Sequence, residues 1–461
     1  FMHRSGIIGH RVDMLKQKFS HSLGLPFRDL LPESMLEKAL AAQGVRYRHR
    51  LYSPQVTVWA FLSQILDQDN TCANAVSRII AWLASQDQPL PSPDPSAYCQ
   101  ARQRLPEGVL GDLLRRVGAG LQAQVPDEGA WCGHRVFLVD GSTVLMPDTA
   151  PNQQAYPQHP NQAEGCGFPI ARFVSLFSLA TGAVLDVEIG SWTTHELHLV
   201  RPLYGHLQAG DVVMGDSLFC TYADMALLQR EGIEAVFAMH GARKVDFRRG
   251  QKLGPDDHLV EWIKPRQCPR GIAPTVFAQL PEKLLMREVR YPVQRKGFRP
   301  KKITLATTFI DPVAYPKEAL ADLFVRRWDA ELDLRHIKTT LGMEMLTCKT
   351  PAMIRKELMC HLLAYNLIRS LLWEAGTQHE VDPLRLSLQD ALRHLHHFLP
   401  ELAHAPTEKR HRVYDRLLFT IARKIVPKRN DRNEPRMRKR RPKPFPWLKK
   451  PRHTLRRKRA A

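Results

Sequence analysis

The sequence has no long hydrophobic run and no closely spaced cysteines. None of its apolar stretches approaches the roughly 20 residues that a membrane-spanning helix needs, so we expect no membrane span. Nothing before the first expected helix is typical of a secretory signal. The eight cysteines are scattered without a Cys-x2-Cys pair, which argues against structural zinc and favours a reduced, cytoplasmic protein. With 44% hydrophobic residues among 461, the chain is long enough for two or three domains.

The chain is poor in acidic residues relative to basic ones. It contains 46 Asp and Glu against 67 Lys and Arg, a net charge of +21. Much of the excess lies in residues 423–459, where eighteen Lys and Arg stand against two acids, and six prolines there prevent a continuous helix. Residues 423–461 are therefore predicted to form a basic, disordered tail that attracts DNA phosphates without reading bases. A solubility tail without further function has the same composition.

The segment from Phe324 to Lys338 is predicted to form a helix that carries chemistry on one face. With Arg327 as the reference, Lys338 falls at about 20° and Glu331 at about 40° around the helix axis. Phe324 falls at about 60°, and an apolar stripe adjoins this face. A carboxylate between two cations suits a site that holds a metal ion and grips a phosphate backbone. A surface helix with ordinary i,i+4 Arg–Glu pairing shows the same pattern.

Two aspartates follow apolar, strand-like segments. Asp140 ends the run 135–140, and Asp216 ends the run 211–216. Ligand sites in open α/β sheets gather at strand ends, so acids there are placed for chemistry, although a single Asp in such a position is more often a turn or cap residue. Together with Glu331, the two aspartates form a ligand set for two hard divalent ions such as Mg²⁺.

These residues resemble a known family. Asp140, Asp216 and Glu331 resemble the DDE triad of transposases with a ribonuclease-H-like core. The segment 324–338 resembles the Tyr-x2-Arg-x3-Glu-x6-Lys signature of the insertion-sequence-4 group, with Phe324 in place of the tyrosine. Further similarity lies in the blocks 97–106, 140–152 and 167–172, so the resemblance covers about residues 30–375.

The predicted fold is α/β: a ribonuclease-H-like mixed sheet with helices, interrupted by an all-β insertion, plus an N-terminal helical domain and the basic tail. Hydrophobic patterns predict core strands at 135–144, 172–180, 183–191, 211–216 and 234–240, with helices near 195–207 and 221–231. The expected domains are an N-terminal helical, DNA-end-binding domain at 1–130, a catalytic domain at 131–375 with the insertion at about 241–310, a helical region at 376–422 and the tail at 423–461.

The resemblance implies a bacterial transposase that excises an insertion sequence through hairpin ends and joins it to target DNA. Two Mg²⁺ ions, for which Mn²⁺ substitutes, would be held by Asp140, Asp216 and Glu331. Implied partners are double-stranded DNA (terminal inverted repeats and target) and a second copy of the chain in a dimeric synapse. The implied location is cytoplasmic and nucleoid-associated.

Further DNA contacts are expected from side chains around the triad, Phe324 among them, and in the N-terminal domain. Arg327 and Lys338 would hold phosphates, and so would Arg335 unless it pairs with Glu331. Trp262 is the candidate for stacking on a flipped base, with a packed core residue as the alternative. N-terminal candidates for backbone contacts are Arg46, Arg48, Arg50, Arg102 and Arg104.

Two departures from the family pattern keep an alternative function open. Phe324 lacks the tyrosine hydroxyl, and Ser217 follows Asp216 where many relatives have arginine. Each change removes one possible phosphate contact. The alternative is a catalytically weakened or host-adopted copy that acts as a DNA-binding repressor or nuclease.

Overall fold

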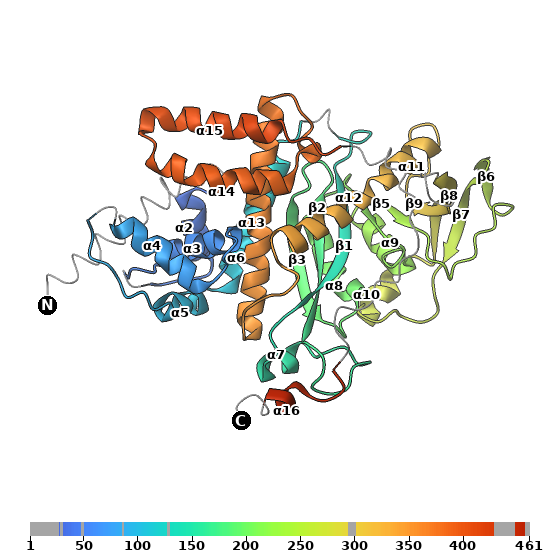
Figure 1. Ribbon diagram of the computed structural model, residues 1–461. Coiled ribbons are helices and arrows are strands. Elements are labelled where there is room, and N and C mark those ends of the chain that lie inside the picture. The colour runs from blue at the N-terminus through green and yellow to red at the C-terminus, as the bar shows by residue number, and fades with distance from the viewer. Residues whose placement is uncertain are drawn as a thin grey trace. The chain divides into compact units, whose positions relative to one another are not determined.

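The computed structural model describes residues 27, 31–47, 50–84, 87–126, 130–293, 301–427 and 448–456. These residues form two compact units (Figure 1). The helical unit comprises segments up to Gln124, residues 181–185 and residues 335–426, and the sheet unit comprises 125–180, 186–334 and the segment after Pro427. The predicted catalytic domain had different limits, because residues 335–375 group with the N-terminal helices. The functional assignment of each domain stays a prediction.

The helical unit is organised by one long helix, α13 (Pro351–Gln378). Twenty of its 28 residues are buried, including residues on every side of the helix, as expected for a helix that other helices surround. A proline at its first position suits the start of a helix, where the missing N–H has no intrahelical partner. Its neighbours are α3 (Pro54–Leu66), α6 (Glu107–Gln122), α14 (Leu388–His404) and α15 (Thr407–Ala422). The unit also contains α2 (Glu33–Ala42), α4 (Cys72–Ala84) and α5 (Ser96–Arg104).

A hairpin turn at residues 181–185 is bonded to α13. The Asn366 amide donates to the carbonyl oxygen of Val184 at 2.7 Å and accepts from its N–H at 2.8 Å. The Tyr365 hydroxyl donates to Gly182 O at 2.9 Å. Val184 begins the edge strand β3 (Val184–Ser191), so the amide satisfies backbone groups that the sheet leaves without a partner.

The sheet unit contains a nine-stranded sheet in the order β3-β2-β1-β4-β5-β9-β8-β7-β6. β1 (Val136–Leu145) runs antiparallel to β2 (Ile170–Ser178) and parallel to β4 (Val212–Gly215), which runs parallel to β5 (Glu234–Ala238). This mixed sheet confirms the predicted ribonuclease-H-like class, and the predicted core strands agree with the observed ones to within two residues. Helices α8 (Glu196–Leu203) and α9 (Tyr222–Arg230) pack on β2 and β5; α7 (Ala150–Ala155) and the 3₁₀ turn Tyr204–His206 are the remaining short elements.

The insertion differs in two respects from the expected all-β domain. Its strands β6 (Gln251–Gly254), β7 (Asp257–Ile263), β8 (Lys283–Val293) and β9 (Lys301–Thr307) continue the core sheet, because β9 pairs with β5. It also contains a short helix, α10 (Pro274–Gln279), which begins at a proline. Among the described helices, none is both long and apolar enough to cross a membrane.

The segment predicted as one helix is broken in two places. Helix α11 (Lys317–Val325) ends before Arg326, α12 (Arg327–Arg335) follows, and residues 336–340 form a π-helical turn. The N–H of Leu341 donates a hydrogen bond to the carbonyl oxygen of His336, five residues earlier, at 3.2 Å. The Thr339 hydroxyl donates to the carbonyl oxygen of Arg335 at 2.6 Å. A π turn contains more residues per turn than an α-helix, so the simple helical count does not give the direction of Lys338.

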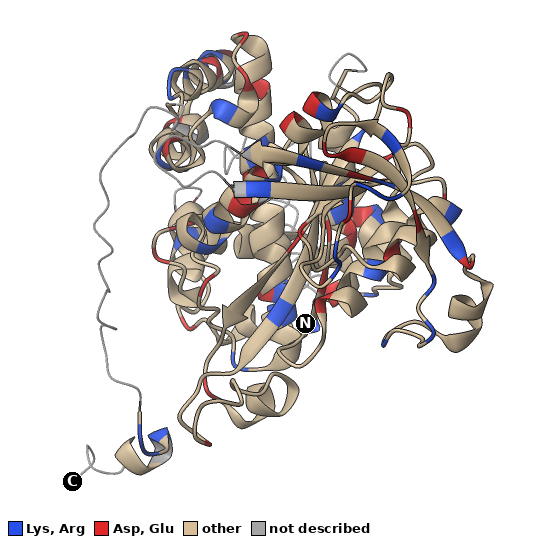
Figure 2. Cartoon of the chain, turned by 90° about the vertical axis from the view of Figure 1, so that its right-hand side faces the viewer, with Lys and Arg blue, Asp and Glu red and all other residues tan. Residues whose placement is uncertain are grey.

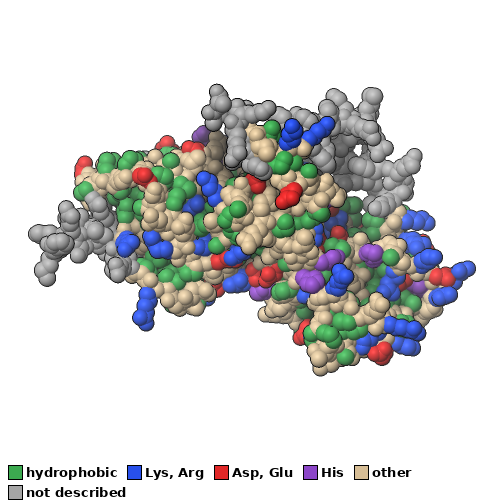
Figure 3. Space-filling model, turned by 90° about the horizontal axis from the view of Figure 1, so that it is seen from below, with side chains coloured by type: hydrophobic (Ala, Val, Ile, Leu, Met, Phe, Trp, Pro, Cys, Tyr) green, Lys and Arg blue, Asp and Glu red, His purple; other side chains and the backbone are tan. Residues whose placement is uncertain are grey.

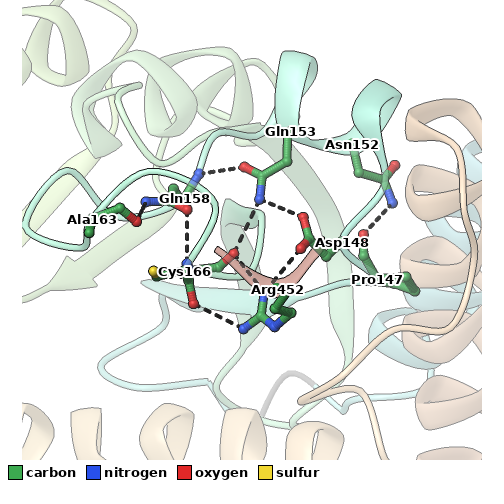
Figure 4. A network of polar contacts seen from close by, with 9 residues as sticks. Pro147, Asp148, Asn152, Gln153, Gln158, Ala163, Cys166 and Arg452 are labelled. Atoms are coloured by element: carbon green, nitrogen blue, oxygen red, sulfur yellow. Dashed lines mark hydrogen bonds and ion pairs between the residues drawn. The ribbon is translucent and has the colours of Figure 1, made fainter. Parts of the chain in front are cut away.

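Part of the predicted disordered tail is ordered. Residues 452–456 form helix α16, and the Arg452 guanidinium donates to Asp148 at 3.1 Å and to the carbonyls of Gly167 and Cys166 at 3.0 Å each (Figure 4). It also lies 3.6 Å from the centroid of the Phe168 ring. The prediction of disorder was wrong for this segment. For residues 428–447 and 457–461 it lies outside the described residues.

We predict that Asn366→Ala destabilises the protein by about 2–6 kcal/mol, because two buried backbone groups lose their partner and each costs about 1–3 kcal/mol. Ser370→Ala on the same helix is the control, since its hydroxyl bonds only a carbonyl of its own helix. Urea unfolding of both variants measures the difference. Equal stabilities would show that the amide does not hold the turn.

Candidate active site

The register of the two central strands brings the two aspartates together. β1 and β4 pair in parallel with Leu138 opposite Met214. Two residues further on in each chain segment stand Asp140 and Asp216, so continuing the register places them abreast. Neighbouring strands lie about 4.8 Å apart. Asp216 directly follows the last residue of β4 and opens a turn in which its carboxylate accepts from Leu218 N at 2.8 Å.

The pKa of Asp140 reports the surroundings of its carboxyl group. Burial raises this pKa from 3.8 to about 7, the Gly141 N–H and Arg327 lower it, and the charges of Asp216 and Glu331 raise it. The side chain therefore lies within electrostatic reach of both other acids and of the arginine. Asp140 thus lies within electrostatic range of the other two predicted metal ligands in the sheet unit.

Helix α12 carries the third acid and is tied to the sheet at its start. Arg326 donates to Leu179 O, just beyond the end of β2, at 3.2 Å. The next residue, Arg327, donates to Glu331 one helical turn later at 2.9 Å. The side chains of Arg327 and Glu331 are 16% and 53% exposed. This i,i+4 pair is the contact that an ordinary surface helix also makes. The proximity of both residues to Asp140 distinguishes it from such a helix.

The donor set fits divalent ions. All three ligands are carboxylates, the ligands that Mg²⁺ prefers, and a cation would relieve the mutual repulsion that contributes to the raised pKa of Asp140. As they lie, the carboxylates are held by Gly141 N, Leu218 N and Arg327. Within the described part of the chain, no three metal-ligating side chains are grouped closely enough to hold one ion. Side-chain rotation toward the ion is therefore required.

The phenylalanine that replaces the tyrosine of the signature lies inside the protein. Phe324 is 4% exposed, and the Arg327 guanidinium carbon lies 5.7 Å from its ring centroid. The charge of Arg327 also acts on Tyr291, whose pKa burial raises above its usual range. The Tyr291 hydroxyl is buried without a hydrogen-bond partner among the described residues. The surroundings of Arg327 thus contain a tyrosine hydroxyl that the sequence pattern did not indicate.

Three other predicted DNA contacts have different outcomes. Arg335 and Lys338 belong to the helical unit, and their phosphate contacts stay predictions. Trp262 is only 2% exposed, donates to Glu288 at 2.8 Å, and has the Arg243 guanidinium carbon 3.7 Å from its ring centroid. This burial argues against stacking on a base, so we assign Trp262 to the core.

Sequence reasoning missed a fourth acid. Glu196, the first residue of α8, lies over Gly141, where an added Cβ would stand 2.8 Å from its carboxylate. Burial raises the pKa of Glu196 most. Arg172 lowers this pKa, and the negative charge of Asp216 raises it further. Arg172 forms an ion pair with it at 3.5 Å and donates to Thr194 O at 2.9 Å. The available signal was Gly141 itself, a residue without a side chain beside a predicted metal ligand.

Comparisons with known proteins identify the family of the chain. Residues 131–367 match the family model of the transposase DDE domain, and residues 21–115 match that of the insertion element 4 transposase N-terminal region. The chain is 26% identical over 362 residues to the transposase InsG for insertion sequence element IS4 of Escherichia coli (strain K12), which covers 78% of each protein. A solved piggyBac transposase synaptic complex with hairpin DNA aligns over 88% of this chain and 86% of that one, at 10% identity and a TM-score of 0.43.

The fold and the DDE domain define the class: a metal-dependent enzyme that cleaves DNA and transfers strands. More narrowly, the chain belongs to the DDE transposases of the insertion-sequence-4 group.

We predict that Asp140→Asn stabilises the metal-free protein above neutral pH. Because the folded pKa of about 7 lies above the unfolded value of 3.8, the contribution of protonated Asp140 is complete below about pH 4 and is lost as pH rises through about 7. The loss of folding stability is at most about 4 kcal/mol, at about 1.36 kcal/mol for each unit of difference between the folded and unfolded pKa. Asparagine does not ionise, so the variant does not lose this stability.

Thermal melts in chelator between pH 4 and 8 measure this difference. Added Mg²⁺ should raise the melting temperature of the wild type more than that of Asp140→Asn, since the variant has lost a ligand. Parallel pH profiles for the two proteins, with equal responses to Mg²⁺, would contradict the assignment.

Proposed function

We propose that this transposase performs cut-and-paste excision of a bacterial insertion sequence. Each DNA end would be processed by nicking, hairpin formation and hairpin resolution before strand transfer into target DNA. The observation that supports it most directly is the electrostatic coupling of Asp140 to Asp216, Glu331 and Arg327. Those four positions match the family signature residue by residue. The electrostatic effect of the other three residues on Asp140 favours an active enzyme over the weakened or adopted copy.

Asp140, Asp216 and Glu331 would hold two Mg²⁺ ions, with Mn²⁺ able to substitute. The chemistry that such ions would supply there is activation of a water or a 3′-hydroxyl and stabilisation of the leaving oxygen. Arg327 has five N–H donors, so it can keep its bond to Glu331 and still donate to a phosphate next to the scissile bond.

The DNA is expected to contact cations outside the catalytic cluster as well. Figure 2 marks Lys and Arg positions on the strands and loops at the β6–β9 end of the sheet unit, and Figure 3 shows basic side chains on the surface at that end. Arg248 and Arg249 there are 90% and 82% exposed, and Lys283 is 60% exposed. Such contacts supply sequence-independent affinity. We assign recognition of the terminal inverted repeats to the N-terminal helices, and we expect a homodimer in the synaptic complex.

The test is cleavage of a duplex that carries an end of the element. Asp140→Ala, Asp216→Ala and Glu331→Ala should each reduce Mg²⁺-dependent cleavage at least about a thousandfold while leaving end binding within about threefold, because each change removes a metal ligand and no docking surface. Asp329→Ala, which also removes an acid from α12, is the control. Near wild-type cleavage by any of the three variants would remove that residue from the active site.

Glu196, which pairs with Arg172 and lies within electrostatic range of Asp216, is proposed as a positioning residue. Glu196→Gln keeps the shape and removes the charge, so we expect about tenfold slower cleavage and a higher Mg²⁺ requirement, as for other groups that support metal ligands. Melting temperature should change little, and Glu196→Asp should restore part of the rate. An unchanged Mg²⁺ dependence in Glu196→Gln would mean that the residue only supports the fold.

A further inference from the structure

The helical unit contains a cavity that the catalytic chemistry does not use. Its volume is about 240 Å³, and it lies between the segment that precedes α3, the first turns of α3 and the end of α5. The side chains that line it include three arginines and two tyrosines: Arg46, Arg50, Arg104, Tyr47 and Tyr52. The rest of the lining is small or apolar, including Pro54, Thr57, Ala101 and Pro106.

The cavity is strongly electropositive. None of the residues that line it is acidic, and within the described part of the chain the guanidinium groups of Arg46, Arg50 and Arg104 make no ion pair. Glu107 follows the lining residue Pro106 in the sequence, but its carboxylate forms an ion pair with Arg355 at 2.7 Å. Three exposed cations gathered around a hollow without a counter-charge favour an anionic ligand.

Arg102 shows that these arginines are not equivalent. It is 7% exposed, donates to Gln64 at 2.9 Å and to the Cys348 sulfur at 3.6 Å, and its guanidinium carbon lies 4.5 Å from the Phe61 ring centroid. The expected backbone contact by Arg102 is therefore wrong, because the side chain is part of the core. Arg104, two residues later, is exposed and lines the cavity.

The two tyrosines are held in place from behind. The Tyr47 hydroxyl accepts from Gln55 Nε2 at 2.6 Å, although the side chain is 37% exposed. Tyr52 packs on Tyr98 with ring centroids 5.7 Å apart, and burial raises its pKa to about 12, so its hydroxyl stays protonated and can donate. Fixed aromatic rings beside arginines are the elements with which proteins hold a sugar or base next to its phosphate.

We propose that this pocket binds one nucleotide of a DNA strand, with the phosphate between the guanidinium groups of Arg46, Arg50 and Arg104 and the sugar or base against Tyr47 and Tyr52. The inference rests on the proposed function, since it makes the pocket a fixed point for DNA on the helical unit. A phosphate contact of this kind sets position along the duplex and carries no sequence information by itself.

The first experiment measures DNA binding without metal, in full-length protein that carries Asp140→Asn. Binding of a fluorescent 20-base-pair duplex is followed by anisotropy between about 0.05 and 0.3 M salt. Arg46→Gln, Arg50→Gln and Arg104→Gln should each weaken binding about eightfold at 0.1 M salt and lower the salt slope by about 0.9, the effect of one phosphate contact. Arg412→Gln, an exposed arginine of α15 outside the cavity, is the matched control and should change neither by as much.

The second experiment identifies the contacted arginines directly. Phenylglyoxal modification followed by mass spectrometry should show Arg46, Arg50 and Arg104 protected by the duplex and Arg412 unprotected. Tyr47→Ala should weaken binding about fivefold or more, whereas Tyr47→Phe keeps the ring and most of the affinity.

The proposal would be overturned if the three arginine variants had the same dependence of DNA binding on salt as Arg412→Gln. It would also be overturned if the duplex did not protect these arginines from phenylglyoxal. Wild-type binding by Tyr47→Ala would overturn the part that concerns the aromatic rings. Neither result bears on cleavage, which the triad variants test separately. Circular dichroism on every variant verifies that the fold is intact.

Discussion

The parallel pairing of β1 with β4 is the constraint on which the active site depends. Once Leu138 stands opposite Met214, Asp140 and Asp216 come abreast regardless of the loops around them. Gly215 permits this close pairing, because an added Cβ there would stand 2.8 Å from Val139 and Phe219 side-chain atoms. The third acid, Glu331, comes from a helix whose start is tied to the sheet by Arg326 at Leu179 O. Two ligands are thus fixed by backbone pairing and the third by helix placement.

This placement has an energetic cost that the function explains. The half-buried Asp140 carboxyl, within electrostatic range of two other acids, has a raised pKa, so in the absence of a cation the ionised form destabilises the fold. Arg327 offsets part of the repulsion by its bond to Glu331. Strain of this kind is expected at a site whose charges are arranged for a ligand and not for the resting protein.

The sequence predicted the core strands and the three carboxylates because both are local signals: apolar runs of strand length and acids where those runs end. It did not predict the break at Arg326, nor the π turn, which depends on the hydrogen bonds of Leu341 N to His336 O and of the Thr339 hydroxyl to Arg335 O. Nor did it distinguish Arg102 from Arg104, or Trp262 in the core from an exposed tryptophan, because burial is decided by tertiary packing. Glu196 was missed for the same reason, since its proximity to Gly141 joins two segments that are far apart in sequence.

The distribution of charge separates attraction for DNA from the chemistry on it. Carboxylates in the catalytic cluster repel a phosphate unless a cation stands between them, so DNA entry into the active site and metal binding must be coupled favourably. The cations of the pocket near α3 and of the β6–β9 end face no such barrier. Under the proposed function, DNA would be held by these surfaces before any metal binds, and the scissile phosphate would enter the site only together with the ions. A metal-free complex that is bound but uncleaved is the physical consequence of this separation.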